Sequence, residues 1–439
     1  MSTTTYRALR RHPLPVAALA VVLFSAACTA DGHGPGDGAP TPGKSSASSV
    51  AEVAPGVTAD TVKIGVVYPD LTAVKQFLKI DHGDYEATYN ALIKEINDAG
   101  GINGRRIVPV YGAVDMASPA AAQQTCARLT QDEKVFAVIG TFNGREPLCY
   151  VQTNRTAIIG GPLTGKNGAL AQAPWFSFDR GGEEVGDAMG LFADGNALAG
   201  KKVAVVGVVN EEGLVKDTVL PALQRLGVTP VETGILDVDL GDTSAVGQQI
   251  GAFIAKFQAA GADTVVVVGG MSGGFPQALE RTKYRPRLLF APLGSVAAYT
   301  GDAAKHDFST LAGAAGLGID VRWNEPGMQR CVATMESAVP ALRGKLSVDP
   351  LTLPAGAPSP QSSLQVACQG LALFRAIAEK AGRSLTYRSF RDAGNGLGAF
   401  AVPGYADKAR YSATTPHGAV PARLWRYDPS ARKFVSTQN

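Results

Sequence analysis

The sequence predicts an α/β fold of two open lobes, each a mostly parallel sheet with helices on both faces. From Thr61 onward, short β-branched runs alternate with long amphipathic stretches, and this alternation begins a second time at Lys202. The length of 439 residues, 45% of them hydrophobic, is enough to bury the cores of two or three domains.

The first series of elements lies between residues 61 and 160. Its strands are rich in valine and isoleucine, and its helices place apolar residues three and four positions apart. The expected strands are Val62–Tyr68, Arg106–Tyr111, Val135–Gly140 and Thr156–Gly160, and the expected helices are Asp84–Asn97, Ala120–Gln131 and Glu146–Asn154. Gly100 and Gly101 provide the left-handed cap at which the first helix can end.

The second series repeats this pattern between residues 202 and 290. Its expected strands are Lys202–Val209, Thr229–Ile235, Asp263–Val268 and Arg287–Phe290, and its expected helices are Val215–Leu226, Ala245–Ala260 and Phe275–Lys283. The remaining chain predicts an extended segment at Gly313–Val321, a long helix at Leu364–Ala381, and strands at Arg423–Tyr427 and Lys433–Val435. We therefore expect two Rossmann-like lobes, the first at 57–178 plus 313–385 and the second at 179–312 plus 386–439.

The first 28 residues have the features of an export signal. Three arginines precede the apolar stretch Val16–Ala27, which is too short to span a bilayer and ends in the small residues Ser25-Ala26-Ala27. Because Cys28 follows directly, the segment resembles a bacterial lipoprotein signal, with Cys28 as the lipid attachment site at the outer face of the cell membrane. An ordinary cleaved signal, with Cys28 incidental, is the alternative.

Composition indicates a tether after this signal and excludes one class of partner. Residues 29–55 are rich in Gly, Pro, Ser, Ala and Thr and have too few large apolar side chains to form a core. The net charge is +3, and it comes from the three arginines of the signal, since the rest has 38 basic and 38 acidic residues. Nucleic-acid binding is therefore not expected.

Four cysteines remain in the folded part of this exported chain, and they allow three disulfide pairings. We favour Cys126–Cys149 and Cys331–Cys368, because each pair lies in one local block and joins segments expected to be neighbouring helices. A metal site is the competing interpretation. No two cysteines have the close Cys-x-x-Cys spacing of a metal site, and the five histidines are scattered along the sequence. We therefore expect neither a metal nor a cofactor.

Two segments match enzyme motifs in part. Gly160–Asn167 approaches the P-loop pattern, but Asn167 replaces the hydroxyl that would bind Mg²⁺ and Pro162 removes a backbone amide, which excludes nucleotide hydrolysis. Gly270–Gly274 fits the Gly-x-Ser-x-Gly pattern of a nucleophile elbow. A hydrolase built on Ser272 would need Asp392 and His417, far downstream in the sequence, as its acid and base. We therefore favour the interpretation of Gly270–Gly274 as a glycine-rich turn and keep the hydrolase as the alternative.

Two motifs resemble the type I periplasmic binding proteins. They are residues 57–65 (VTADTVKIG) and 95–105 (EINDAGGINGR), and the resemblance is narrowest to the binding proteins for branched-chain amino acids that supply ABC importers. The resemblance implies two α/β lobes joined by three hinge strands, with a small polar ligand held between them. It also implies a non-enzymatic protein that acts as a monomer and delivers its ligand to an ABC permease. A receptor that signals through a membrane partner is the alternative.

The resemblance further implies that ligand contacts come from loops that follow strands, as expected at the carboxyl edge of a parallel sheet. The implied contacts are Tyr68, Asp70, Thr141, Asn143, Leu163 and Thr164 in the first lobe, and Asn210, Glu211, Met271 and Ser272 in the second. The second lobe departs from the amino-acid binders, because Glu212-Gly213 replaces an aromatic-Gly pair and residues 269–275 contain no acid. We therefore expect an organic acid, an amide or another polar metabolite. A branched-chain amino acid held by Glu211 or Glu212 is the alternative.

Overall fold

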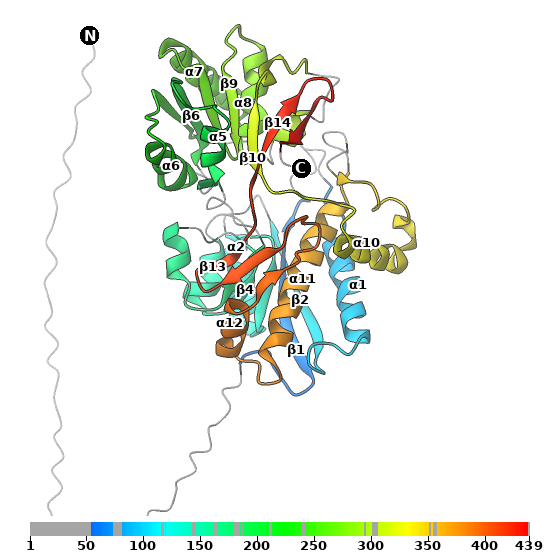
Figure 1. Cartoon of the computed structure of the whole chain (residues 1–439). Helices are drawn as coiled ribbons and strands as arrows, with labels where there is room; N and C mark the ends of the chain where they lie inside the picture. Colours follow the sequence, from blue (N-terminus) through cyan, green and yellow to red (C-terminus); the bar gives the residue numbers. More distant parts are fainter. Residues whose placement is uncertain are drawn as a thin grey trace, which may run out of the picture. The chain divides into compact units, whose positions relative to one another are not determined.

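The computed structural model describes the chain from Ala54 to Thr437, with gaps. The described residues are 54–72, 81–115, 118, 120–142, 146–161, 163, 165–178, 185–186, 188–209, 213–238, 242–293, 296–300, 306–350, 353 and 358–437. The expected signal, the lipid attachment site Cys28 and nearly all of the expected tether lie outside them. Within this part the strands form two large sheets and one small sheet (Figure 1).

The first sheet is entirely parallel and has the strand order β2-β1-β3-β4-β5. Its strands are β1 (Thr61–Asp70), β2 (Arg106–Asp115), β3 (Ala137–Gly140), β4 (Ala157–Ile159) and β5 (Trp175–Phe176). Successive β1 residues alternate between faces: Val62, Ile64 and Val66 point into one apolar core, whereas Val67 points into another. Burial on both faces explains why these strands are continuous apolar runs.

Helices cover both faces of this sheet. One core contains α1 (Tyr85–Asp98), α10 (Pro326–Ala338), α11 (Gln361–Ala381) and α12 (Tyr387–Asn395), and Figure 1 shows α1, α10 and α11 side by side. The other core contains the short helices α2 (Ala121–Ala127) and α3 (Glu146–Leu148), each continued by one π-helical segment, Arg128–Asp132 and Cys149–Thr153. A 3₁₀ segment, Gly165–Leu170, follows β4.

The second sheet has the strand order β15-β14-β10-β9-β8-β6-β7, and only its β14 and β15 pairings are antiparallel. Its strands are β6 (Val203–Val208), β7 (Glu232–Leu236), β8 (Thr264–Val268), β9 (Arg287–Ala291), β10 (Ala315–Gly318), β14 (Arg423–Asp428) and β15 (Lys433–Ser436). One face packs on α7 (Thr243–Ala259), α8 (Met271–Glu280) and α9 (Val296–Thr300). The other packs on α5 (Gly190–Asp194) and on the π-helical Leu214–Val219 with α6 (Leu220–Arg225).

The strand pairing differs from the lobe boundaries expected from the sequence. β10 pairs with β9 and β14 in the second sheet, whereas the sequence predicts 313–385 in the first lobe. Conversely, α12 packs on α11 in the core of the first sheet, whereas the sequence predicts 386–439 in the second lobe. The physical reason is that these segments are short or weakly periodic, so their sequence pattern does not indicate the sheet on which each packs.

A small antiparallel sheet, β11-β12-β13, lies in the sequence between α12 of the first lobe and β14 of the second sheet. Its strands are β11 (Gly398–Phe400), β12 (Ala409–Ser412) and β13 (Thr415–Ala419), and Tyr411 of β12 is buried in the core of the first sheet. The chain passes between the two large sheets three times, after β5, after β10 and after β13. This is the mixed α/β two-lobe arrangement with three crossover segments that the sequence predicts.

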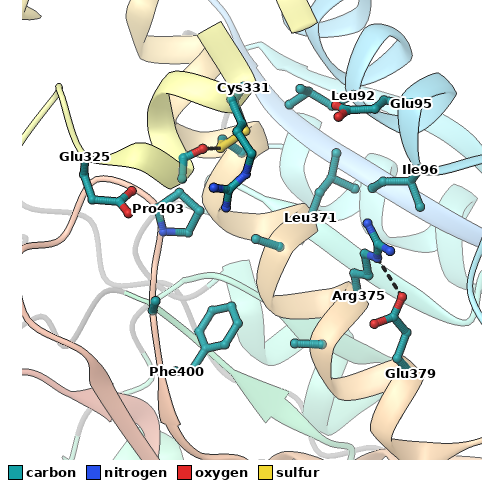
Figure 2. A pocket seen from close by; sticks show the side chains of 16 residues that line it. Leu92, Glu95, Ile96, Glu325, Cys331, Leu371, Arg375, Glu379, Phe400 and Pro403 are labelled. Carbon is teal, nitrogen blue, oxygen red and sulfur yellow. Dashed lines mark hydrogen bonds and ion pairs between the residues drawn. A yellow bond between two sulfur atoms is a disulfide. The ribbon is translucent and has the colours of Figure 1, made fainter. Parts of the chain in front are cut away.

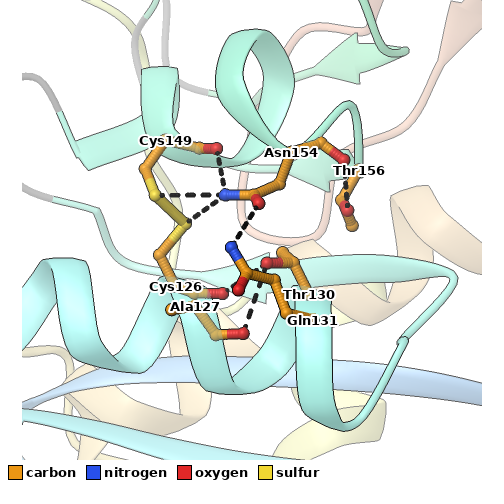
Figure 3. Close-up of a disulfide and its surroundings, with 7 residues drawn as sticks. All are labelled: Cys126, Ala127, Thr130, Gln131, Cys149, Asn154 and Thr156. Carbon is orange, nitrogen blue, oxygen red and sulfur yellow. Dashed lines mark hydrogen bonds between the residues drawn. A yellow bond between two sulfur atoms is a disulfide. The ribbon is translucent and has the colours of Figure 1, made fainter.

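Two disulfides tie helices together within the first lobe, and they are the pairs favoured from the sequence. Cys126 of α2 joins Cys149, whose neighbour Asn154 donates from Nδ2 to the Cys149 carbonyl over 2.9 Å (Figure 3). Cys331 of α10 joins Cys368 of α11, with a Cα–Cα distance of 6.0 Å. The bridges close loops of 23 and 37 residues.

Replacing both cysteines of the first bridge with alanine is expected to lower the free energy of unfolding by about 2–4 kcal/mol, because the unfolded chain regains loop entropy. Denaturant unfolding measures this loss, and non-reducing peptide mapping of the parent protein should recover both cross-linked peptide pairs. Free thiols at all four positions in the exported protein would contradict the pairing.

Gly394 of α12 provides a test of packing between this late helix and the first sheet. A Cβ at this position would collide with the ring of Phe176 in β5, whereas a Cβ at Gly251 of α7 would meet nothing within 4 Å. Gly394→Ala is therefore expected to destabilise the protein by about 1–3 kcal/mol. Gly251→Ala is expected to stabilise it by up to about 1 kcal/mol, because alanine favours a helix interior. Equal effects in thermal unfolding would refute this packing.

Candidate functional site

The carboxyl edge of the first sheet brings together the loops that the sequence nominates. β1, β3 and β4 are adjacent and parallel, so the residues that follow them leave the sheet at the same edge. The backbone N–H of Thr141 donates to the Val67 carbonyl over 3.1 Å, which fixes the start of the loop after β3. The turn needs a glycine before it, because Gly140 has a φ of 146°.

Tyr68 and Asp70 occupy the end of β1 at this edge. The Tyr68 ring is stacked on Tyr85 with the ring centroids 5.2 Å apart, and its hydroxyl donates to the carboxylate of Glu86. Burial, together with the hydrogen bond to Glu86, raises the pKa of Tyr68 far above its usual range. Asp70 accepts a hydrogen bond from the backbone N–H of Thr72 at 2.9 Å. Tyr68 is therefore a neutral ring at every physiological pH.

Aromatic neighbours of Tyr68 form a part of this edge that the sequence analysis did not identify. Tyr85 is the first residue of α1, and burial raises its pKa to about 12. Its hydroxyl lies 3.2 Å from Nδ1 of His82, in the segment that leads into the helix. The helix itself begins here because Asp84 accepts from the backbone N–H of Ala87 as its N-cap. In the sequence the only trace of this aromatic cluster is that Tyr85 and Tyr89 follow His82 at helical spacing, a pattern that also fits ordinary core packing.

Two of the expected contacts have side chains in the apolar cores. Leu163 is 2% exposed and packs in the core that contains Phe142 and Trp175. Met271, also 2% exposed, is the first residue of α8 and packs in the core of the second sheet. At these two positions the side chain contributes to packing. Asn143, Thr164, Asn210 and Glu211 lie outside the described residues, as does Glu212.

The arrangement around Ser272 differs from a nucleophile elbow. The helix α8 begins at Met271, four residues before the start expected from the sequence, so Ser272 is its second residue. The left-handed turn before α8 is made at Gly269, which has a φ of 52°, three residues before Ser272, whereas in an elbow the serine itself sits on the strained turn. The supposed partners are elsewhere: His417 is buried beside Trp175, and Asp392 lies on α12, both in the first lobe.

A separate groove of about 290 Å³ lies on the helical face of the first lobe (Figure 2). Its floor is apolar, with Leu92, Ile96 and Leu371 from α1 and α11, and the disulfide of Cys331 lies at one end. On its rim Arg375 donates from Nε to Glu379 over 2.7 Å. None of the ligand contacts implied by the sequence lines this groove, so it is distinct from the carboxyl edge of the sheet.

The described part of the chain contains neither a metal-binding cluster nor a membrane-spanning helix. There, no group of three or more His, Cys, Asp or Glu side chains is arranged to hold a metal ion. No helix among the same residues combines the length and apolar character needed to cross a bilayer.

Comparison with known proteins identifies the family. The sequence profile of the periplasmic binding proteins matches residues 61–431, which is most of the chain and includes the first sheet and every strand of the second except β15. The chain belongs to the periplasmic binding protein family. A search of curated proteins found no match to this sequence.

Solved structures of this family share the fold of the chain at low sequence identity. A type 1 periplasmic binding protein from Bordetella pertussis Tohama I is 17% identical with a TM-score of 0.61, and the match covers 86% of this chain and 99% of that one. A substrate-binding protein of an ABC transporter from Desulfitobacterium hafniense, in complex with Leu, is 14% identical (TM-score 0.58; 86% and 100% covered). A solute-binding protein from R. palustris, in complex with 4-hydroxybenzoate, is 15% identical (TM-score 0.59; 87% and 96% covered).

The N-cap of α10 predicts a pH dependence of stability. The Glu325 carboxylate accepts from the backbone N–H groups of Met328 and Gly404, each at 3.0 Å. Burial opposes ionisation, but these hydrogen bonds outweigh it and lower the pKa of Glu325. A lowered folded-state pKa gives stability that is complete above the unfolded pKa and disappears as the pH falls through the folded pKa.

Glu325→Gln is therefore expected to cost about 1 kcal/mol of unfolding free energy at pH 7, with the difference from the parent narrowing at acid pH. Denaturant unfolding at several pH values measures it. Glu379→Gln, which removes a partly exposed pair with Arg375, is the control and should cost less than half as much. A cost at Glu325 that stays constant down to pH 3 would contradict this role.

Proposed function

We propose that this chain is an exported, lipid-anchored solute-binding protein of an ABC importer, which captures a small polar ligand between its two lobes. The observation that carries the proposal is that three crossover segments connect two separate sheets, the first parallel and the second mixed. A chain of this design can bend at the crossovers while each lobe keeps its core intact. Lipid attachment at Cys28 would keep the protein near a permease in the same membrane.

In this proposal the lobe boundaries are defined by the sheet and the core to which each segment belongs. We assign residues 54–178 and 322–419 to the first lobe, and 185–318 and 423–437 to the second, because each set shares its own sheets and cores. Ligand contacts to both lobes would form only when the lobes close. The ligand therefore stabilises the closed state by its differential affinity, which is the physical basis of capture.

The ligand that fits best is a small organic acid, an amide or another polar metabolite. Tyr68 offers a neutral ring face, and Thr141 offers a hydroxyl and lies next to the glycine turn after β3. An unpaired charge on a ligand would be costly in a closed cleft. The stretch 269–275 lacks the acid that would pair an ammonium group, and one protein of the same fold binds 4-hydroxybenzoate. Leucine, the ligand of another such protein, is the alternative.

A thermal-shift screen of amino acids, carboxylic acids and amides tests this ligand class. We expect the largest increase in melting temperature with a carboxylate or an amide, because ligand at a hundred times its Kd adds about 2.7 kcal/mol to stability. Thr141→Ala should weaken that ligand three- to tenfold through the loss of one hydrogen bond. Arg388→Gln, on the exposed side of α12, is the matched control and should leave binding unchanged.

A dominant response to leucine or valine that Glu211→Gln abolishes would overturn the preference for acids and amides. It would leave the capture mechanism intact and favour the branched-chain amino acid alternative. A second candidate activity, ester hydrolysis by Ser272, is disfavoured by the helical position of that residue. Because Ser272 is also an implied ligand contact, Ser272→Ala is expected to weaken binding, with no ester turnover in either protein. If the parent protein hydrolyses an ester and this variant only binds it, the hydrolase is correct.

A neighbouring set of permease and ATPase genes would support import. Signalling through a membrane partner would instead predict that ligand binding proceeds normally while no permease subunit copurifies with the anchored protein. The two functions share the binding site and closure, so the ligand screen applies to both.

A further inference from the structure

Three arginines lie together at the amino edge of the second sheet, opposite the edge where ligand contacts are expected. Arg287 is the first residue of β9, Arg285 precedes it by two positions, and Arg426 in β14 is paired with Ala315, the first residue of β10. These three side chains, with Asp263 and Gly313, line a cavity of about 470 Å³.

Strand register places Arg287 and Arg426 on the same face. Leu289 and Leu424, each two positions away along its strand, are members of one apolar core, and strand residues two apart point the same way. Between β9 and β14 runs β10, which enters the sheet through the small residues Gly313 and Ala314. The two guanidinium groups therefore flank a stretch of backbone with little side-chain volume, which leaves the cavity open.

Hydrogen bonds hold two of the arginines in place without neutralising them. Arg285 donates from Nη1 to the carbonyls of Leu279 and Thr282 over 2.9 and 2.7 Å at the end of α8. Arg287 donates from Nε to the Gly313 carbonyl over 2.9 Å. These carbonyl acceptors are neutral, so both guanidinium groups keep their positive charge. The remaining N–H groups of the two guanidinium groups can donate to a ligand.

The cluster lacks a matching set of carboxylates. Among the residues that the structure describes, no ion pair joins Arg285, Arg287 or Arg426 to an acid, and Asp263 is the only acid that lines the cavity. Burial, and then the positive charge of Arg426, lower the pKa of Arg287. Like charges thus repel one another at this edge in the absence of an anion.

Elsewhere in the chain, arginines near the crossovers do have carboxylate partners. Arg423 donates to Asp407 over 2.7 Å, and Arg322 donates to Asp320 over 2.8 Å. At the amino edge, hydrogen bonds from Ser309, and to a smaller extent the charge of Arg285, lower the pKa of Asp307. Asp263 lines the cavity, so these two acids only partly balance the three arginines.

We propose that Arg285, Arg287 and Arg426 form a binding site for a phosphate-type oxyanion, either the free ion or the headgroup of an anionic phospholipid. Guanidinium groups present paired N–H donors that match the geometry of phosphate oxygens, and their charges favour a dianion over a neutral ligand. Because the site is at the amino ends of the strands, it is independent of the ligand contacts proposed at the carboxyl ends. Loss of one would not remove the other.

The test uses inorganic phosphate with the full chain in a low-salt buffer, and sodium chloride at matched ionic strength as the reference. We expect phosphate to raise the melting temperature saturably beyond the chloride reference. Arg426→Gln should reduce phosphate affinity at least tenfold. Without phosphate the melting temperature of this variant should not fall, since the Arg426 side chain makes no hydrogen bond or ion pair among the described residues and its removal relieves repulsion with Arg287.

Arg388→Gln, an exposed arginine of α12, is the matched control and should keep the full phosphate response. Arg287→Lys is the second variant: it keeps the charge but loses the paired donors, so affinity should fall without loss of fold in circular dichroism. The proposal is overturned if the parent shows no response beyond chloride, or if Arg426→Gln responds as strongly as the parent.

Vesicles distinguish the two sources of the anion. Cosedimentation with phosphatidylglycerol vesicles, but not with phosphatidylcholine vesicles, that requires Arg426 and is competed by phosphate would assign the site to a lipid headgroup. A phosphate response without Arg426-dependent vesicle binding would assign it to the free ion. Both outcomes support an oxyanion site, and both are separate from the metabolite screen at the carboxyl edge.

Discussion

The chain passes between its two sheets three times, and the small sheet β11-β12-β13 bonds to the first two of the crossing segments. The N–H of Ser177, at the start of the first crossover, donates to the Pro416 carbonyl of β13 over 3.0 Å, and the Tyr411 hydroxyl of β12 donates to the Ser177 carbonyl over 2.9 Å. Arg322, in the second crossover, donates from its backbone N–H to the carbonyl of Gly404, between β11 and β12, over 2.8 Å. Buried polar groups left without these bonds would cost free energy, so the crossovers and the small sheet form one laterally bonded unit.

Charge reinforces this unit where the second and third crossovers meet. Arg423, the first residue of β14, bonds to Asp407 at 2.7 Å and lies 3.9 Å from Asp320, which follows β10. The ion pair with Asp407 and the charge of Asp320 both favour the protonated guanidinium and raise the pKa of Arg423. Arg423 therefore ties the end of the third crossover to Asp320 in the second crossover and to Asp407 in the loop before β12.

The two edges of the parallel sheets have different chemistry as a consequence of topology. At the carboxyl edge of the first sheet, strands end in glycine turns, in Tyr68 and Thr141, and in the acid Asp70. At the amino edge of the second sheet, helix ends and strand starts bring Arg285 and Arg287 together with Arg426 of the antiparallel β14. The described residues thus place an aromatic ring, a hydroxyl and a carboxylate at one edge and three arginines at the other.

The sequence by itself determined the two α/β series and the disulfide pairs, because periodicity and loop glycines act over a few residues. In the motif 95–105, Gly101 has a φ of 68° and Ile102 bridges back to Arg105, so this family motif encodes a turn rather than a site. Only the tertiary structure decided the rest. α12 begins at the capping box of Thr386 and Ser389, a local signal that was present but has no apolar run to support it. The place of β10 in the second sheet depends on pairing with β9, 26 residues earlier, and with β14, more than a hundred residues later, and the latter pairing brings Arg426 to Arg287. No local pattern records these partners.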